Sequence, residues 1–209
     1  MNNDTKNKLT SGTDQADLTT GNACWETPPL VFQKLNDDFG PFDLDLTADE
    51  TRHLCPHWFG PDSPVGQYDA LTAKWRDFGT SGYSNPPYGP FIQRLLPHAL
   101  HEAFNMGFST TLLLPMRVTK AFKAYVLKGA SDLLFCDTRL TFFENGMPRL
   151  NEKNFRERGR AVADPAVFDS IIVRYRPNVT TLNVGIWHVP PHVTKDDLDR
   201  AVGRRRKAA

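Results

Sequence analysis

The sequence has little net charge and no long apolar run. Its 209 residues include 25 Lys or Arg and 24 Asp or Glu, giving a formal net charge of +1. Global charge therefore gives no reason to invoke a nucleic-acid partner. No apolar run approaches the length of a membrane span, and the N-terminus lacks the charged-then-apolar pattern of a signal peptide. We expect a soluble, cytoplasmic protein that makes no membrane contact.

Cysteine is also scarce. The chain has three widely spaced cysteines, Cys24, Cys55 and Cys136. Their odd number and wide spacing favour a reduced intracellular protein over a disulfide framework. Cys55 lies between His53 and His57, but Pro56 interrupts any helix that would align these side chains, and a fourth ligand is not evident. We therefore expect no metal site.

The length fits one globular domain and would be cramped for two. Residues 1–22 are almost entirely polar or small, so we interpret them as a disordered N-terminal arm. Residues 23–190 form the expected folded domain. Residues 191–209 form a basic C-terminal tail whose Arg and Lys run at 204–207 can contact phosphates or can simply be a solvated end.

Hydrophobic periodicity predicts an α/β fold. Apolar residues at three- and four-residue steps predict a helix over residues 91–104, kinked at Pro97, between a strand that ends near Ser84 and a buried strand over 109–114. The order strand, helix, strand is typical of a parallel sheet. The remaining pattern predicts a helix after a Thr27 cap, a helix over 119–127, strands over 42–47, 132–136, 140–143, 167–175 and 182–189, a turn at 144–146, an irregular loop over 48–64 and a mobile insertion over 151–163.

The stretch Asn85-Pro86-Pro87-Tyr88 follows the first strand of that parallel unit. The two prolines prevent the chain from continuing as a helix or as a hydrogen-bonded strand. What remains is a stiff loop with one amide side chain, one free carbonyl and one aromatic ring. Asn85 Oδ1 and the Pro86 carbonyl can accept the two hydrogens of an aromatic amine such as adenine N6, exposing its lone pair to an electrophile. Tyr88 can stack on the ring of a flipped-out base.

A purely structural interpretation of this loop is that Asn85 caps the turn and Tyr88 packs on the surface. The position of the loop favours the functional interpretation. It follows the carboxyl end of a strand and precedes a strong helix, where open α/β sheets place their ligand crevice.

Other candidate residues lie near neighbouring elements. Asp43, Asp45 and Asp49 can accept hydrogen bonds from the hydroxyl or ammonium groups of a cofactor, or can belong to ordinary turns and caps. The segment 25–28 can bring backbone groups and a helix N-terminus to a carboxylate. Positions with a potential role in contacting DNA, each equally able to form an ion pair or a cap, are Arg117, Thr119 and Arg139.

Several motifs in one order resemble the phage-type DNA N-6-adenine methyltransferases, the phage Dam family. They are Trp25-Glu26-Thr27-Pro28, residues 39–45 with Ala48, Asp69-Ala70-Leu71 before Trp75, Asn85-Pro86-Pro87-Tyr88-Gly89, residues 113–117 with Thr119 and Phe122, and Arg139-Leu140 with Phe142. The resemblance runs from residue 25 to about 175. It departs from methyltransferases at large in lacking a glycine-rich loop after residues 42–47. It departs from many relatives in carrying Phe168-Asp169-Ser170 where they have a proline before the serine.

The resemblance implies a class I methyltransferase, Rossmann-like sheet with helices on both faces and a reversed strand near one edge. It implies an enzyme, encoded by a phage or prophage in a bacterial cell, that transfers a methyl group from S-adenosylmethionine to adenine N6. The partner would be double-stranded DNA with a flipped adenine, and a monomer is favoured. The implied catalytic residues are Asn85, Pro86, Pro87 and Tyr88, and the implied cofactor pocket is Trp25, Thr27, Pro28, Asp43, Asp45 and Asp69.

Three alternatives remain open at this point. Cytosine-N4 and RNA methylation present the same amine geometry, and Asn at the first loop position favours adenine only by family analogy. A catalytically silent DNA-binding protein, such as an anti-restriction factor, would keep the fold without the reaction. Because little chain remains for a separate recognition domain, we expect a short or weakly specified target read by Arg117, residues 144–165 and the basic tail.

Overall fold

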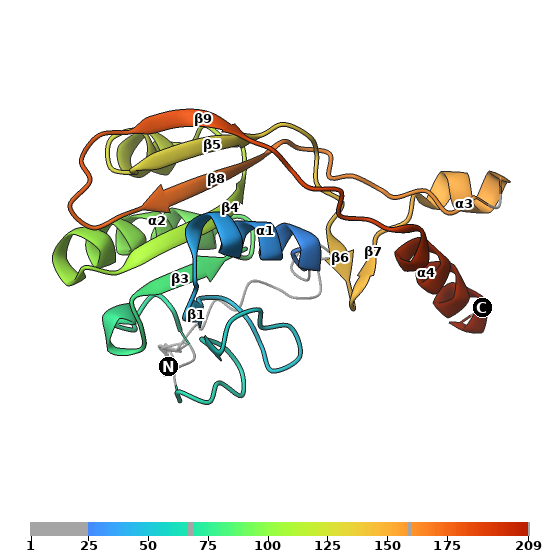
Figure 1. Cartoon of the computed structure of the whole chain (residues 1–209), viewed down its shortest axis with the longest axis horizontal. Helices are drawn as coiled ribbons and strands as arrows, with labels where there is room; N and C mark the ends of the chain where they lie inside the picture. Colours follow the sequence, from blue (N-terminus) through green and yellow to red (C-terminus); the bar gives the residue numbers. More distant parts are fainter. Residues whose placement is uncertain (1–24, 67–68, 159, 209) are drawn as a thin grey trace, which may run out of the picture.

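The computed structural model describes residues 25–66, 69–158 and 160–208. The predicted N-terminal arm, residues 1–22, lies outside the described residues. A seven-stranded sheet forms the centre of the protein (Figure 1). Its strands, from one edge to the other, are β2 (His57–Trp58), β1 (Leu44–Asp45), β3 (Ser81–Ser84), β4 (Ser109–Pro115), β8 (Ser170–Tyr175), β5 (Asp132–Cys136) and β9 (Asn183–Trp187).

Only β8 runs against its neighbours among these strands. It pairs antiparallel with both β4 and β5, whereas the other adjacent pairs are parallel. The prediction of a mixed, mostly parallel sheet is confirmed. The reversed strand lies between β4 and β5, so two further strands separate it from the nearer edge of the sheet.

Helices cover both faces because the buried strands alternate their apolar side chains between two cores. Leu112 and Leu114 of β4 point into one core, and Leu113 points into the other. The first core packs against α2 (Pro90–His101), the π-helical turn η2 (Glu102–Met106) that continues it, and η3 (Phe122–Val126). The second core contains Val31 and Leu35 of α1 (Pro29–Phe39).

The unit β3, α2 and β4 confirms the predicted parallel strand–helix–strand order. Pro97 lies inside α2, as expected from the sequence. The strand predicted over 42–47 is confirmed as β1, although its ladder spans only two residues. Three other local predictions were wrong. The loop over 48–64 contains β2, the insertion over 151–163 contains α3 (Glu152–Arg158), and the basic tail folds as α4 (Lys195–Ala208).

Side-chain caps explain the two missed helices. Asn151 Oδ1 accepts the backbone N–H of Asn154 at 3.0 Å and so caps α3. At α4, Thr194 and Asp197 form a reciprocal capping box, in which Thr194 Oγ1 accepts the Asp197 N–H at 3.1 Å and Asp197 Oδ2 accepts the Thr194 N–H at 2.9 Å. The many charged residues of both segments had favoured their interpretation as solvated chain.

Two other expectations fail for tertiary reasons. Thr27 does not cap α1, because its hydroxyl hydrogen-bonds to the Tyr83 hydroxyl at 2.7 Å and Pro28 occupies the cap position. The strand expected over 140–143 is reduced to β6 (Phe143–Glu144), because the Thr141 N–H donates to His192 Nε2 at 3.0 Å instead of to a neighbouring strand. The apolar pattern there reflects burial of Leu140 and Phe142 in the second core.

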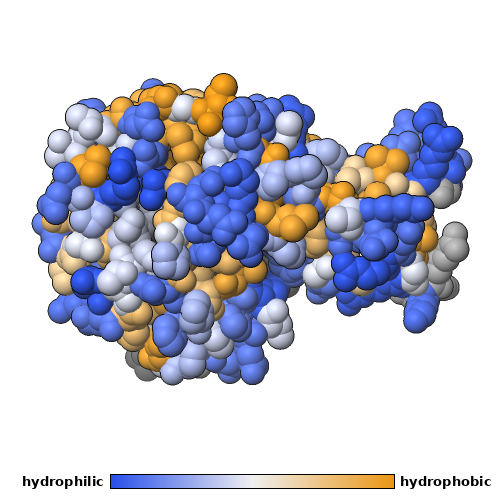
Figure 2. All heavy atoms as spheres, in the orientation of Figure 1, coloured by the Kyte–Doolittle hydropathy of each residue, from blue (hydrophilic) through white to orange (hydrophobic). Residues whose placement is uncertain are grey.

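A lobe projects from one end of the sheet and comprises β6, β7 (Met147–Pro148), α3 and α4 (Figure 1). In the space-filling view the lobe is set off from the main body by a narrower waist (Figure 2). The two strands form an antiparallel hairpin whose turn residues Asn145 and Gly146 both have positive φ, as the predicted turn requires. The Arg205 guanidinium lies 5.5 Å from the centre of the Phe155 ring and so joins α4 to α3.

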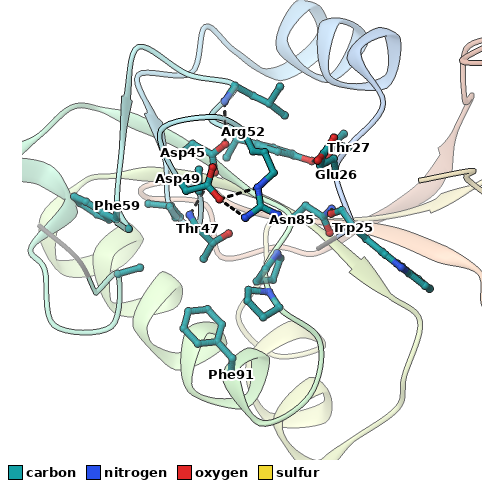
Figure 3. A pocket seen from close by; sticks show the side chains of 18 of the residues that line it. Trp25, Glu26, Thr27, Asp45, Thr47, Asp49, Arg52, Phe59, Asn85 and Phe91 are labelled. Carbon is teal, nitrogen blue, oxygen red and sulfur yellow. Dashed lines mark hydrogen bonds and ion pairs between the residues drawn. The ribbon is translucent and has the colours of Figure 1, made fainter. Parts of the chain in front are cut away.

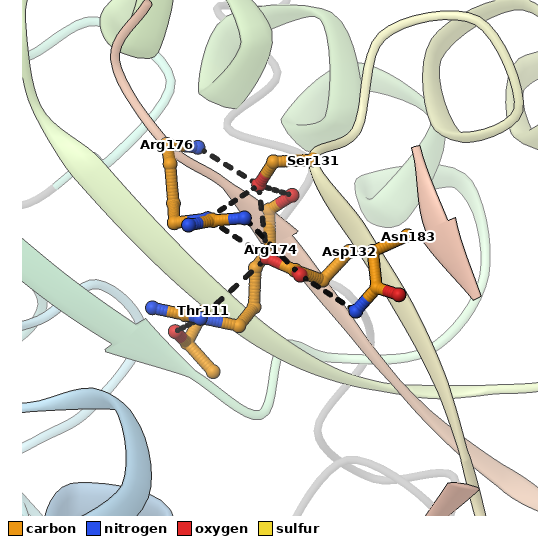
Figure 4. A network of polar contacts seen from close by, with 6 residues as sticks. All are labelled: Thr111, Ser131, Asp132, Arg174, Arg176 and Asn183. Carbon is orange, nitrogen blue, oxygen red and sulfur yellow. Dashed lines mark hydrogen bonds and ion pairs between the residues drawn. The ribbon is translucent and has the colours of Figure 1, made fainter. Parts of the chain in front are cut away.

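A partly buried charge network joins the last three strands at one edge of the sheet, β8, β5 and β9 (Figure 4). Asp132, at the start of β5, accepts from Arg174 at 3.5 Å, from Arg176 at 3.0 Å and from Asn183 at 3.2 Å. Burial lowers the pKa of the Arg174 guanidinium, and the Asp132 carboxylate opposes this shift. The network lies at the amino end of β5, away from the carboxyl ends of the parallel strands, so we assign it to stability.

We expect Asp132→Ala to lower the free energy of unfolding by about 3 kcal/mol, because it leaves buried Arg174 without its carboxylate. Urea unfolding measures the loss, and the exposed Asp77→Ala serves as a matched control with an expected change below about 0.5 kcal/mol. An equal loss in both variants would contradict the role given to the network.

Candidate active site at the carboxyl ends of the strands

A cavity of about 250 Å³ lies where β1 and β3 end (Figure 3). Segments from four parts of the chain meet around it: residues 25–27, residues 45–61 from the end of β1 onward, residues 69–70, and residues 83–91 at the end of β3 and after it. Its lining residues are Trp25, Glu26, Thr27, Asp45, Leu46, Thr47, Ala48, Asp49, Arg52, Leu54, Phe59, Gly60, Pro61, Asp69, Ala70, Tyr83, Asn85, Pro86, Pro87, Tyr88 and Phe91. The predicted ligand crevice therefore coincides with a real cavity.

Asn85 is held in one orientation at the wall of this cavity. Its Nδ2 donates to the Trp25 carbonyl oxygen at 2.9 Å, and its Oδ1 accepts from the Tyr88 hydroxyl at 3.1 Å. An amide oxygen has two lone pairs, so Oδ1 keeps the capacity to accept a second hydrogen bond. Because Trp25 fixes the nitrogen end, the oxygen end is the acceptor that the loop presents.

Tyr88 is fixed by an aromatic cluster, defined by Trp25, Tyr88, Phe142 and Phe168. The Tyr88 ring meets Trp25 edge-on at 6.0 Å and Phe168 edge-on at 5.4 Å between ring centres. Trp25 in turn stacks on Phe142 at 5.3 Å and on Phe168 at 5.4 Å. Burial raises the pKa of the Tyr88 phenol well above its usual range, so its hydroxyl stays protonated and can donate to Asn85.

Asp45 is a buried carboxylate with few partners. Its side chain is 4% exposed, and it accepts the backbone N–H groups of Thr47 at 3.3 Å and Leu54 at 3.2 Å. Desolvation by burial raises the pKa of Asp45 to about 6, against the opposing effect of these two hydrogen bonds. A ligand that brings a hydroxyl or ammonium donor would relieve this incomplete solvation.

The mouth of the cavity carries further polar and aromatic groups. Arg52 forms an ion pair with Asp49, with Nε at 2.7 Å from Oδ2, and Figure 3 shows the pair beside Asp45. Asp69 Oδ1 accepts the Leu71 N–H at 2.8 Å and so shapes the loop that borders the cavity. Phe91, at the start of α2, adds an aromatic face.

The structure brings most of the predicted pocket residues together. Trp25, Thr27, Asp45, Asp69 and all four residues of the Asn85–Tyr88 loop line the one cavity. Pro28 and Asp43 do not. The Asp43 carboxylate lies toward the other end of β1, where it accepts the N–H groups of Thr80 at 2.7 Å and Ser81 at 3.2 Å.

The three residues expected at the substrate lie outside the cavity lining. Thr119 Oγ1 accepts the Phe122 N–H at 3.1 Å, which is the geometry of a helix cap. Arg139 forms an exposed ion pair with Asp169 at 3.1 Å. Arg117 is exposed and lies close enough to Tyr88 for its charge to act on the phenol.

Sequence reasoning missed Phe59, Gly60 and Phe91 as lining residues. Gly60 has φ of 144°, and a Cβ there would lie 1.9 Å from the Ala48 carbonyl oxygen. The close approach brings the two ends of the 48–60 loop together at the cavity. The glycine–proline pair at 60–61 marked a break in the sequence, but nothing in it indicated which distant backbone it approaches.

We expect Gly60→Ala to lower the free energy of unfolding by about 2–4 kcal/mol, because it adds a clash with Ala48 to the cost of a disfavoured φ. The control is Gly66→Ala, which shares a positive φ of 69° but meets no atom within 4 Å. Its expected cost is about 1 kcal/mol. Similar losses in urea unfolding would show that the approach to Ala48 is not important.

A family model described as DNA N-6-adenine-methyltransferase (Dam) matches residues 16–165, which include every residue that lines the cavity. A search of curated proteins found no match. In the described part of the chain, we find no group of three or more His, Cys, Asp or Glu side chains placed to hold a metal ion, and no helix long and apolar enough to cross a membrane. Since the match spans well over half of its length, the chain belongs to the DNA N-6-adenine-methyltransferase (Dam) family.

Proposed function

We propose that this protein transfers a methyl group from S-adenosylmethionine to the N6 amino group of adenine in DNA. The observation that carries the proposal is the orientation of Asn85. Its amide nitrogen is occupied by the Trp25 carbonyl, so its oxygen is presented as an acceptor beside a cavity. Family membership supports adenine in DNA as the target.

The cavity has the donor and acceptor chemistry that S-adenosylmethionine needs. The ammonium and ribose hydroxyl groups of the cofactor are hydrogen-bond donors. Asp45 offers them a carboxylate whose burial raises its pKa to about 6, against the lowering effect of two backbone hydrogen bonds. Asp69 supplies a second carboxylate at the border, and Phe59 and Phe91 supply aromatic faces for a purine ring. When bound, the cofactor supplies an electrophilic methyl group.

The loop residues would orient the target amine. Asn85 Oδ1 and the Pro86 carbonyl oxygen would accept the two N6 hydrogens and leave the nitrogen lone pair exposed. Pro86 and Pro87 keep this backbone stiff, so the acceptors need little reorganisation. The Tyr88 ring, set by its contacts to Trp25 and Phe168, would stack on the flipped base.

The sheet supports the class I methyltransferase fold as part of this proposal. A single reversed strand, β8, enters a sheet that is otherwise parallel, and helices cover both faces. The cavity lies at the carboxyl ends of β1 and β3, where such sheets bind nucleotides. The proposal includes a phage or prophage origin, supported by the family resemblance, and a monomer in the cytoplasm of the bacterial cell.

Duplex DNA is the proposed partner. The C-terminal helix α4 carries four consecutive basic residues at 204–207, and Arg117 is exposed near Tyr88. These side chains can neutralise phosphates on either side of a flipped base. Cytosine N4 and RNA remain chemically compatible with the loop, whereas a silent DNA-binding protein would not need Asn85 fixed as an acceptor.

A pool of random-sequence duplexes, incubated with the protein and S-adenosylmethionine and then mapped for modified bases, tests this proposal. We expect N6-methyladenine within a short or loosely defined consensus. RNA of the same random sequence serves as the competing substrate. Methylation confined to RNA, or N4-methylcytosine as the product, would contradict the assignment to adenine in DNA, and a long strict consensus would contradict the small recognition surface.

A further inference from the structure

Glu26 ties the turn of the β6–β7 hairpin to the active-site wall. Its carboxylate oxygens accept the N–H groups of Asn145 at 2.9 Å and Gly146 at 2.8 Å. Its backbone also exchanges two hydrogen bonds of 2.9 Å with Phe143, one in each direction. Because both turn residues have positive φ, consecutive N–H groups converge on one carboxylate. Four hydrogen bonds therefore fix the turn relative to residue 26.

The preceding residue, Trp25, connects Glu26 to the catalytic loop. Its carbonyl oxygen accepts the amide N–H of Asn85 at 2.9 Å. Its indole packs in the aromatic cluster against Tyr88, and the Arg149 guanidinium, just after β7, lies 4.8 Å from the indole ring centre. Displacement of the hairpin would thus move the peptide group that orients Asn85.

The outer side of the same turn faces the basic helix. Arg204 Nη1 donates to the Asn145 carbonyl oxygen at 3.0 Å. A second cavity, about 260 Å³, lies between the hairpin and α4, and its lining includes Arg149, Arg204 and Arg205. A DNA phosphate bound by these arginines would therefore lie next to the turn that is hydrogen-bonded to Glu26 and could shift its position.

We propose that Glu26 is a positioning residue that couples the docking of duplex DNA on the lobe to the orientation of Asn85. The inference rests on the proposed function, because it assumes a DNA substrate. The Glu26 carboxylate accepts hydrogen bonds from the N–H groups of the turn, and Arg204 donates a hydrogen bond to the carbonyl oxygen of the same turn. A duplex bound to the arginines fixes the position of the turn. The turn then fixes the position of Trp25, whose carbonyl oxygen orients the side-chain amide of Asn85 that accepts the target amine.

The test compares two substrates in single-turnover methyl transfer. One is a duplex long enough to reach the lobe, and the other is a short single-stranded oligonucleotide that contains adenine and is too short to reach it. We expect Glu26→Gln to lower the rate on the duplex by about tenfold and the rate on the oligonucleotide by less than about twofold. The matched control is Asp77→Asn, which removes an exposed carboxylate that lines neither cavity and should leave both rates unchanged.

A second variant keeps the test decisive if Glu26→Gln is poorly folded. Arg204→Ala lies outside the active-site cavity and should also lower the duplex rate selectively. Combined with Glu26→Gln, it should lower the duplex rate no further than the more severe single change, because both act through one turn. Equal losses on the two substrates, or independent effects of the two changes, would overturn the inference. If the wild type labels no DNA at all, the proposed function itself fails.

Discussion

Replacing Asn85 with alanine is expected to lower the rate of methyl transfer by about 10²–10³-fold, while cofactor affinity changes by less than about threefold. The expectation follows from the position of the amide. In the proposed reaction, Asn85 Oδ1 accepts a hydrogen of the target amine, and the side-chain amide is held by Trp25 and Tyr88. Single-turnover transfer with saturating cofactor measures the first quantity, and calorimetric titration of the cofactor measures the second.

Asn85→Asp separates acceptor capacity from orientation. Aspartate can accept a hydrogen bond but cannot donate to the Trp25 carbonyl oxygen, which lies 2.9 Å from the amide nitrogen. We therefore expect a substantial loss, smaller than that of Asn85→Ala. Tyr88→Phe removes only the 3.1 Å hydrogen bond to Asn85 and should cost less than either change. A fully active Asn85→Ala would remove the loop from the chemistry.

Replacing Asp45 with asparagine is expected to weaken cofactor binding by about 10- to 100-fold while making the protein more stable at neutral pH. Burial raises the pKa of Asp45 from 3.8 to about 6. Above pH 6 the folded protein holds a carboxylate that would be better solvated in the unfolded chain, which costs at most about 3 kcal/mol. Asparagine removes that cost together with the charge that attracts the cofactor.

The same shift predicts a pH dependence with a definite sign. Because the proposed contact to the cofactor needs the ionised carboxylate, the dissociation constant of the wild-type protein for S-adenosylmethionine should rise as pH falls through about 6. The loss of stability caused by the buried carboxylate should shrink as the pH falls from about 6 to 3.8, because Asp45 takes up its proton in the folded state over this range. Both trends should be absent in Asp45→Asn.

Asp43→Asn is the matched control, since Asp43 lies on the same segment but outside the cavity. It should leave cofactor affinity within about twofold of the wild type at pH 7.5. It should also lower stability, because it weakens the hydrogen bonds to Thr80 and Ser81. Loss of affinity in Asp43→Asn, with unchanged affinity in Asp45→Asn, would contradict the assignment of the cofactor pocket.

Local pattern was enough to predict the centre of the fold. The spacing of apolar residues over 91–104 and the two prolines at 86–87 specify a helix and a stiff loop without help from the rest of the chain. These are the features on which the position of Asn85 depends. The βαβ order then places the loop at the carboxyl end of a strand, which is where the cavity lies.

The rest depended on contacts between distant residues. Asp43 and Asp45 occupy equivalent places in an alternating pattern, but only pairing of β1 with its neighbours decides that Asp45 lies at the cavity and Asp43 at the Thr80 backbone. Gly60 gave no sign of its approach to Ala48. Thr194 and Asp197 have the three-residue spacing of a capping box, which indicates a helix start. The many charged residues over 195–207 nevertheless favoured the interpretation of this segment as a solvated tail.

The measurement that tests the central claim most directly is the transfer of labelled methyl from S-adenosylmethionine to unmethylated DNA, followed by digestion to nucleosides. Wild-type protein and Asn85→Ala are assayed side by side, with cofactor binding confirmed for both. We predict labelled N6-methyladenine from the wild type and almost none from the variant. A wild-type protein that binds the cofactor and leaves DNA unlabelled would contradict the account.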